Sequence, residues 1–309
     1  MPVIVYLGAH IGIANGLAEA VLDGHRIGCE AIQIFSKSPQ MWSGPPTSAE
    51  AAERFRAAVR TEGIRATAVH HGYLANLASP KHDLLLRARQ AFRDELGRAE
   101  LLGVDGLIFH PGAHLGSGPE AGIRTLIESL QEALEAYPEG KVRILLENSA
   151  GQGTTIGRTF EELAAVLSGV ERRDRLGVTL DTCHLFAGGV DFRTPEGYGR
   201  LVDEIDSVLG RTTVRAFHLN DAKAELGSHL DRHENIGKGE IGRAGFRQIL
   251  NDPRWAETPG YLETPLDERD YERYAEDLRT LRALVASPSK AKAKPRPSRR
   301  KARPSSTVK

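Results

Sequence analysis

Eight short apolar segments alternate along this chain with stretches of helical character, and this alternation limits the fold more than any other feature. The apolar segments are VIVYLGAH, AIQIFS, RATAVH, GLIFHP, VRILLEN, LGVTLD, VRAFHL and GYLET. The helical stretches that follow them span residues 16–28, 48–62, 83–103, 119–137, 159–169, 195–210, 242–251 and 271–286. Apolar strands that alternate with helices predict an α/β protein with a parallel sheet. Eight such units predict a single (β/α)8 TIM barrel.

The size and composition of the chain fit one such barrel. A TIM barrel takes roughly 250 residues, and we expect residues 1–286 of the 309 to form it. Apolar residues make up 40% of the chain, enough for a large core. No apolar run reaches the ~20 residues that a membrane-spanning helix needs, and we expect no signal peptide before the first strand. Cys29 and Cys183 give no disulfide framework, so we expect a protein of the reducing cytoplasm.

Residues 287–309 differ sharply in composition from the rest of the chain. They hold nine basic side chains and no acidic one, and prolines interrupt them repeatedly. Subtracting these nine from the 41 basic residues leaves 32 against 41 acidic ones in residues 1–286, a formal charge of −9. Such a segment cannot bury enough apolar surface to fold, so we expect a disordered tail. Its charge favours contact with a nucleic-acid backbone.

Most of the predicted strands end on a side chain that can bind a metal ion. Only the second strand, which ends near Ser36, lacks one. The other seven end on His10, His70, His110, Glu147, Asp181, His218 and Glu263. Because the reactive groups of a TIM barrel gather at the C-terminal ends of its strands, we expect these side chains to converge. A lone histidine at a strand end is usually structural, but burying this many unpaired polar groups would cost too much free energy.

Two local spacings extend the set of candidate ligands. In Asp181-Thr-Cys-His184 an imidazole follows a strand-end carboxylate by three residues, and in Asp231-Arg-His233 two ligands can point the same way along extended chain. Nitrogen and oxygen ligands without cysteine suit zinc, with manganese or iron as alternatives. The nine candidates exceed the needs of one tetrahedral ion and indicate two or three ions that share a bridging carboxylate. They are His70, His110, Glu147, Asp181, His184, His218, Asp231, His233 and Glu263.

The remaining histidines and Cys183 receive weaker assignments. We expect His71 to point to the opposite face of its strand from His70, and Cys183 to serve in packing. For His10 and His114 two roles fit equally well, either contact with the metal ligands or a purely structural role. The residues expected at the surface are His25, His82 and His229.

Eight motifs resemble the endonuclease IV family of zinc-dependent apurinic/apyrimidinic endonucleases. They are GAHIGIANGL, HHGYLANLASP, FHPGAH, ENSAGQG, DTCHLFAGG, FHLNDAK, DRHENIGKGEIG and LET, and the resemblance covers about residues 3–283. It implies three zinc ions in a TIM barrel, with Glu147 and Glu263 as catalytic residues. His70 and His110 would hold one ion, which Glu147 bridges to a second. The implied ligands of the second ion are Asp181, His218 and Glu263, and those of the third are His184, Asp231 and His233.

The same resemblance implies a reaction on damaged duplex DNA. Enzymes of this family cut the phosphodiester on the 5′ side of an abasic site, leave a 3′-hydroxyl and a 5′-deoxyribose phosphate, and clear blocked 3′ ends. Tyr73 and Leu74 match positions that probe the duplex at the lesion. Gln40 stands where the family commonly has an arginine, close to Trp42, so the grip on phosphate is expected to weaken. We expect a monomer associated with the nucleoid.

Three other functions fit parts of this pattern. A sugar isomerase or epimerase would use a similar barrel with a smaller metal site, which leaves the His184, Asp231 and His233 set without a role. A protein that only binds abasic DNA would not need Glu147 and Glu263 around ions. A structural zinc site is usually closed and four-coordinate, unlike ligands spread over a barrel mouth.

Overall fold

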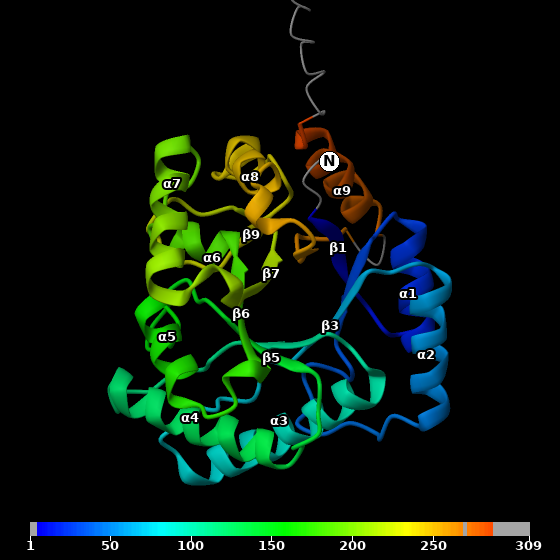
Figure 1. Cartoon of the computed structure of the whole chain (residues 1–309), viewed down its shortest axis with the longest axis vertical. Helices are drawn as coiled ribbons and strands as arrows, with labels where there is room; N and C mark the ends of the chain where they lie inside the picture. Colours follow the sequence, from blue (N-terminus) through cyan, green and yellow to red (C-terminus); the bar gives the residue numbers. More distant parts are fainter. Residues whose placement is uncertain (1–4, 268–270, 287–309) are drawn as a thin grey trace, which may run out of the picture.

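The fold is a closed barrel of eight parallel strands, as the alternation of strands and helices predicts (Figure 1). The computed structural model describes residues 5–267 and 271–286. Strand β1 pairs with both β2 and β10, which closes the sheet. The barrel strands are β1 (Tyr6–Ile11), β2 (Ala31–Ile34), β3 (Ala66–His70), β4 (Gly106–Phe109), β5 (Arg143–Glu147), β6 (Leu176–Asp181), β7 (Val214–His218) and β10 (Pro259–Leu262).

Eight helices follow the strands and surround the barrel as a ring, in which the colours of Figure 1 pass once around the molecule in chain order. Ser48, Thr159 and Thr194 cap three of them by accepting a backbone N–H with the side-chain oxygen. These helices are α1 (Leu17–Arg26), α2 (Ala49–Thr61), α3 (His82–Leu102), α4 (Pro119–Glu135), α5 (Phe160–Gly169), α7 (Pro195–Glu204), α8 (Gly242–Leu250) and α9 (Glu272–Leu284). A π-helical turn, Ile205–Leu209, extends α7 toward the predicted end at residue 210.

Besides short 3-10 turns at Arg173–Arg175, Arg211–Thr213 and Pro253–Trp255, one short helix and two short strands were not predicted, and these three elements lie in the loops at the C-terminal ends of the strands. Helix α6 (Thr182–Ala187) starts directly after β6. Strands β8 (Asp221–Ala222) and β9 (His233–Glu234) form a two-stranded antiparallel sheet in the long segment after β7. Elements of two to six residues are too short to show a periodicity in the sequence.

Inward-facing residues of the barrel strands alternate with outward-facing ones, and this alternation places the last inward-facing side chain of each strand at the C-terminal mouth. Small or apolar residues such as Ala68, Ile108 and Ala216 lie two positions before a polar residue that ends the same strand or directly follows it. These inward apolar residues form a cluster separate from the larger core between sheet and helices. Because successive side chains of a strand point to opposite faces, each strand delivers one polar group to the same layer.

No helix within residues 5–267 and 271–286 is long and apolar enough to cross a membrane. The predicted tail, residues 287–309, lies outside the described residues, so its predicted disorder and the domain boundary at residue 286 stay predictions.

Candidate metal centre

The fold brings all nine candidate ligands to the C-terminal mouth of the barrel. Four of them are the last residues of their strands, which are His70, Glu147, Asp181 and His218. His110 and Glu263 follow the last residues of β4 and β10 directly. The other three stand on α6, on β9 and in the loop before β9, and they are His184, His233 and Asp231.

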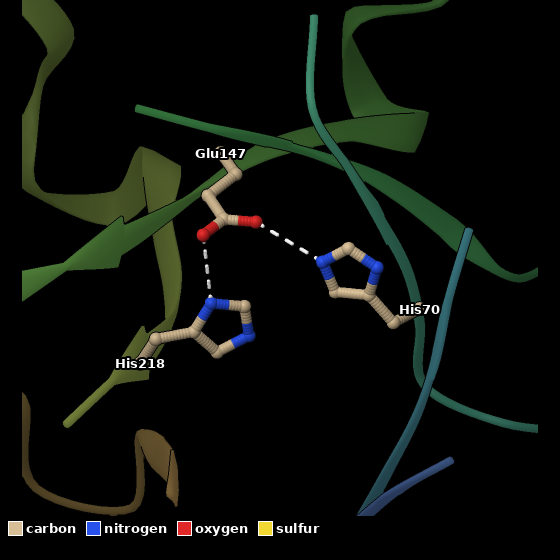
Figure 2. A group of neighbouring side chains, drawn as sticks. All are labelled: His70, Glu147 and His218. Atoms are coloured by element: carbon tan, nitrogen blue, oxygen red, sulfur yellow. Dashed lines mark hydrogen bonds and ion pairs between the residues drawn. The ribbon is translucent and has the colours of Figure 1, made fainter. Parts of the chain in front are cut away.

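Glu147 is a buried member of this constellation, and its carboxylate lies between the imidazoles of His70 and His218 (Figure 2). Its Oε2 lies 3.1 Å from Nε2 of His70, and its Oε1 lies 2.9 Å from Nδ1 of His218. Nε2 of His110 approaches the same Oε2 to 3.7 Å. Glu147, His70 and His218 are all buried. A carboxylate with an imidazole on each oxygen has the arrangement of a bridging ligand between two ions.

A second group of four donors shares Glu147 and His218 with the first. Ligand atoms of Glu147, Asp181, His218 and Glu263 all lie within 4.8 Å of one another. Nδ1 of His218 lies 3.5 Å from Oε2 of Glu263 and 3.9 Å from Oδ2 of Asp181. Three carboxylates around one imidazole make a strongly negative pocket that can hold a divalent cation.

The third group joins α6 to the segment around β9. The two carboxylate oxygens of Asp231 each lie 3.2 Å from an imidazole Nε2, one of His184 and one of His233. The spacing of the Asp181-x-x-His184 motif has a local cause, because Asp181 caps α6 and its Oδ1 accepts the backbone N–H of His184 at 2.8 Å. One turn of helix therefore places the two ligands side by side.

Each of three histidines is bonded at Nδ1 to a backbone carbonyl, so that Nε2 points at the carboxylates. Nδ1 of His70 bonds to the carbonyl of His71, that of His184 to Asn148 and that of His233 to Glu263, at 2.8, 2.8 and 3.1 Å. Nε2 of His233 is buried and, among the residues that the structure describes, forms no hydrogen bond of good geometry, although Oδ1 of Asp231 lies 3.2 Å away. An imidazole fixed at one nitrogen presents the lone pair of the other, which is the arrangement that metal ligands require. The residues therefore fit a metal centre.

The charges of the site also fit bound cations. Burial lowers the pKa of His218, but the carboxylates of Glu263 and Glu147 outweigh burial and raise it to about 9. Burial raises the pKa of Glu147, yet the imidazoles of His218 and His110 outweigh it and hold that pKa well below its usual range. The pKa of His233 is likewise about 9, because Asp231 and Asp181 offset the effect of burial. Buried carboxylates that stay charged need positive charge beside them, and divalent cations can replace the protons of the imidazoles.

The site opens to solvent on one side. The side chains of His110 and Asp231 are 35% and 42% exposed, in contrast to the buried Glu147. A cavity of about 350 Å³ adjoins them, between the loops that follow β3, β4 and β5. Tyr73, which is 67% exposed, stands over this opening with its ring 6.0 Å from that of His110. A substrate would therefore approach past Tyr73, His110 and Asp231.

The four residues predicted to contact DNA lie on two neighbouring loops at this mouth. Tyr73 and Leu74 follow β3 and expose large apolar side chains, with Leu74 42% exposed. Gln40 follows β2 and is exposed, whereas Trp42 in the same loop is half-buried and packs against the core. The two loops touch, because Gly72 lies against the backbone of Pro39. Their contact with DNA stays a prediction.

The other histidines and Cys183 lie as follows. His71 faces away from the site and packs edge-on against Phe92, and His114 accepts the backbone N–H of Gly118. His10 does reach the site, with Nδ1 3.1 Å from Oε1 of Glu263. The Sγ of Cys183 can reach Asp181 and His233, but burial raises the pKa of its thiol, which donates to the carbonyl of Arg232. The exposed histidines are His25, His82 and His229.

Sequence reasoning missed three amide side chains that touch the candidate ligands. Gln33 of β2 contacts Glu263 and His218. Asn220 donates to Oδ2 of Asp181 at 2.7 Å and accepts the backbone N–H of Glu263 at 2.8 Å. The Oδ1 of Asn148 accepts the backbone N–H of Asp181. For Gln33 the signal was present in the sequence, because it lies at the inward alternation position of its strand.

Comparison with known proteins places this site in a family context. A model of the xylose isomerase-like TIM barrel family matches residues 22–284. The chain is 45% identical to probable endonuclease 4 of Geobacter sulfurreducens, across 91% of this chain and 94% of the relative. The crystal structure of endonuclease IV from Thermus thermophilus has a TM-score of 0.80 and 34% identity, covering 90% of this chain and 98% of that one. A 3-keto-D-glucoside 4-epimerase from E. coli, at 14% identity and a TM-score of 0.67 over 91% and 100% of the two chains, shares the fold alone.

Proposed function

The chain belongs to the endonuclease 4 family of xylose isomerase-like TIM barrels, and we propose that it is a DNA-repair endonuclease that hydrolyses the phosphodiester 5′ to abasic sites in duplex DNA. The products are a 3′-hydroxyl and a 5′-deoxyribose phosphate, and the same site removes blocking groups from 3′ ends. The array of nine donors in three adjacent groups, two of which share Glu147 and His218, supports this proposal more strongly than any other observation.

Three zinc ions are the proposed cofactors. His70 and His110 would hold one ion, Glu147 would bridge to the second, and Asp181, His218 and Glu263 would complete that one. The third would lie among His184, Asp231 and His233. Bound zinc would supply a water ionised near neutral pH and positive charge that stabilises the transferred phosphate. Six positive charges against four carboxylates would make the pocket attractive to a phosphodiester although residues 1–286 carry a net charge of −9.

The chain's own residues prepare the site before substrate arrives. Backbone carbonyls and Gln33 fix the imidazoles, so that little reorganisation is needed when a phosphodiester binds. Glu147 is proposed as a catalytic residue at the buried floor, and Glu263, 17% exposed, as a second one at the wall. His110 and Asp231 form the open side, which lets a backbone phosphate enter while the floor excludes bulk water.

The loops that follow β2 and β3, which expose Gln40, Tyr73 and Leu74, are proposed to recognise the lesion. An exposed wedge such as Tyr73 with Leu74 must unstack a base to enter a duplex, and the cost is lowest where a base is already missing. Gln40 can hydrogen-bond to the backbone but carries no charge to pair with phosphate. The monomeric state and the association with the nucleoid remain predictions.

The reaction can be tested by the origin of the new phosphate oxygen. We expect cleavage of an abasic duplex in ¹⁸O-labelled water to place one labelled oxygen on the 5′-phosphate product, and we expect a polymerase to extend the 3′ end without further treatment. An unlabelled phosphate, or an enzyme–DNA adduct trapped during turnover, would contradict direct hydrolysis.

The metal count separates this function from that of a sugar isomerase. Elemental analysis of the purified protein should give three ions per chain, and His233→Ala should lower that count by one. A sugar isomerase of the same fold would hold one or two ions and leave abasic DNA intact. Tight binding of abasic DNA with three ions and no turnover would indicate a protein that only binds damage.

A further inference from the structure

Strand β2 contributes a side chain to the metal centre although no His, Asp or Glu lies at its end. Gln33 points into the barrel and is fully buried. In the sheet register it lies beside His10 of β1 and Ala68 of β3. That position is the inward layer from which the neighbouring strands extend their own polar groups. A buried amide costs free energy unless its donors and acceptor are bonded, so the partners of Gln33 determine its role.

Within the described part of the chain, the Gln33 amide bonds to candidate ligands and to the histidine beside them. Its Oε1 lies 2.8 Å from Nε2 of His218. Its Nε2 lies 2.6 Å from Oε1 of Glu263 and 2.9 Å from Nδ1 of His10. The carboxylate of Glu263 accepts only, so the NH₂ end of the amide must face it, and this fixes the orientation of the amide. The oxygen is then left to accept an N–H from His218.

This contact decides which nitrogen of His218 is available to an ion. When Nε2 carries the proton that Gln33 accepts, the lone pair is on Nδ1. Nδ1 is the atom that faces the carboxylates, at 2.9 Å from Glu147 and 3.5 Å from Glu263. The other three fixed histidines are held at Nδ1 by the backbone, whereas His218 is held at Nε2 by a side chain. Its tautomer therefore depends on one replaceable residue.

We propose that Gln33 is a positioning residue that fixes the tautomer of His218 and the rotamer of Glu263 for the ion that these two residues share with Glu147 and Asp181. The inference rests on the proposed metal centre and assigns to β2 a role beside the ligands that the other strands supply. The amide holds the ligands from the side away from the ion and takes no part in coordination. Partners of this kind typically change metal affinity by 10- to 100-fold when they are removed.

Removal of the amide is tested with Gln33→Met and Gln33→Leu, which keep most of the side-chain volume. Zinc dissociation constants are measured stepwise by competition with a chromophoric chelator, on the full chain. We expect one bound ion to dissociate 10- to 100-fold more readily, while the ion at His184, Asp231 and His233 keeps its affinity. Gln131→Ala, a half-buried amide on α4 remote from the site, is the matched control and should change none of the constants.

A second measurement reports the hydrogen bond between Gln33 and Nε2 of His218 directly. Long-range ¹H–¹⁵N spectra of the zinc-loaded protein should show His218 protonated at Nε2 in the wild type and a loss or broadening of that proton signal in Gln33→Met. Circular dichroism of the metal-free variants establishes whether they fold. If Gln33→Leu does not fold, the measurements are made on Gln33→Met alone.

The outcomes separate this inference from the proposed function. A folded Gln33→Met protein with all zinc constants and the His218 signal unchanged overturns the role of Gln33, even if the wild type cuts abasic DNA. An equal rise in the dissociation constants of all the zinc ions would also overturn it, since that result indicates a general packing role for Gln33. A wild type that binds no zinc would overturn both the metal centre and this inference together.

Discussion

A buried charge cluster between α3 and the ends of β2 and β3 is centred on Glu95 of α3, which is 1% exposed. Its carboxylate accepts from Arg98 Nη2 at 2.8 Å and from the hydroxyl of Ser36, and Lys37 Nζ lies 3.6 Å away. His71, 3.8 Å from the same carboxylate, faces it from the end of β3. Lys37 also donates to the carbonyl of Met41, so the cluster ties the loop after β2 to the body of the protein.

This cluster predicts a pH-dependent contribution to stability. Burial raises the pKa of Glu95, but His71, Arg98 and Ser36 outweigh burial and lower it to about 2 from 4.5. A carboxyl with a lowered folded pKa stabilises the protein above about pH 4.5 and loses that effect as the pH falls toward 2, a contribution of roughly 3 kcal/mol. Replacing Glu95 with glutamine also leaves buried cations unpaired, which costs about 3–5 kcal/mol at pH 7.

We therefore expect Glu95→Gln to lower the free energy of unfolding at pH 7. As the pH falls from 4.5 to 2, the free energies of unfolding of the variant and the wild type should converge. Denaturant titrations of both proteins across this range measure the difference. Glu53→Gln, on the exposed face of α2, is the control and should change stability little. A constant difference between wild type and Glu95→Gln at all pH values would contradict the assignment.

At the residue scale, the sequence predicts side chains that can bind a metal ion more readily than the amides that contact them. The nine candidate ligands could be predicted because imidazoles and carboxylates at strand ends are conspicuous. Gln33 and Asn220 were missed because an amide carries no distinctive metal chemistry, and their value lies in contacts with particular ligands. The exposed Tyr73 was identified, yet Trp42 in the neighbouring loop packs against the core, which its sequence position did not reveal.

At the scale of elements, the segment between β7 and α8 is held by one buried carboxylate. Asp221 of β8 accepts five backbone N–H groups, at 2.8 to 3.2 Å. Their donors are Ala222, Gly237, Gly239, Ile241 and Gly242. The approach is close, because a Cβ on Gly239 would lie 2.4 Å from the carbonyl oxygen of Ala222. The loop that follows β9 is thereby folded back onto β8, and β9 carries His233.

Replacing Asp221 with alanine should release this loop. The substitution removes five bonds and leaves buried N–H groups without partners, so we expect the free energy of unfolding to fall by at least ~3 kcal/mol. Amide hydrogen exchange should accelerate at residues 237–242 more than in the barrel strands. Asp174→Ala, an exposed carboxylate, is the control. Unchanged exchange in this loop would show that other contacts hold it.

The main elements could be predicted from the sequence, but the short ones could not. Periodicity over ten or more residues identified every helix that surrounds the barrel. Helix α6 has six residues, and it forms because Asp181 caps it. The β8–β9 pair depends on Asp221 and on contacts across more than ten residues, which no local pattern shows.

At the scale of the whole molecule, charge is divided between an acidic body and a basic tail. Residues 287–309 carry nine basic side chains. If the tail contacts about four phosphates, its removal should flatten the slope of log K against log salt by roughly 3.6. Binding of undamaged duplex DNA by the full chain and by residues 1–286, at several salt concentrations, measures this slope. Equal slopes would mean that the tail does not touch DNA.

The closed barrel was predictable because eight repeats of one pattern have few other solutions. What the sequence could not supply is the depth of each ligand. Glu147 is buried at the floor, whereas Asp231 is 42% exposed, and this difference arises from strand register and loop packing. The direction of substrate approach, past Tyr73 and His110, follows from those depths.

The most direct measurement is cleavage of a labelled duplex that carries one tetrahydrofuran analogue of an abasic site. This analogue cannot undergo β-elimination, so any cut must be hydrolytic. We predict a single nick immediately 5′ to the analogue by the zinc-loaded protein, and its loss in Glu147→Gln, while Gln131→Ala cuts as the wild type does. An intact duplex with protein that carries three zinc ions would contradict the account.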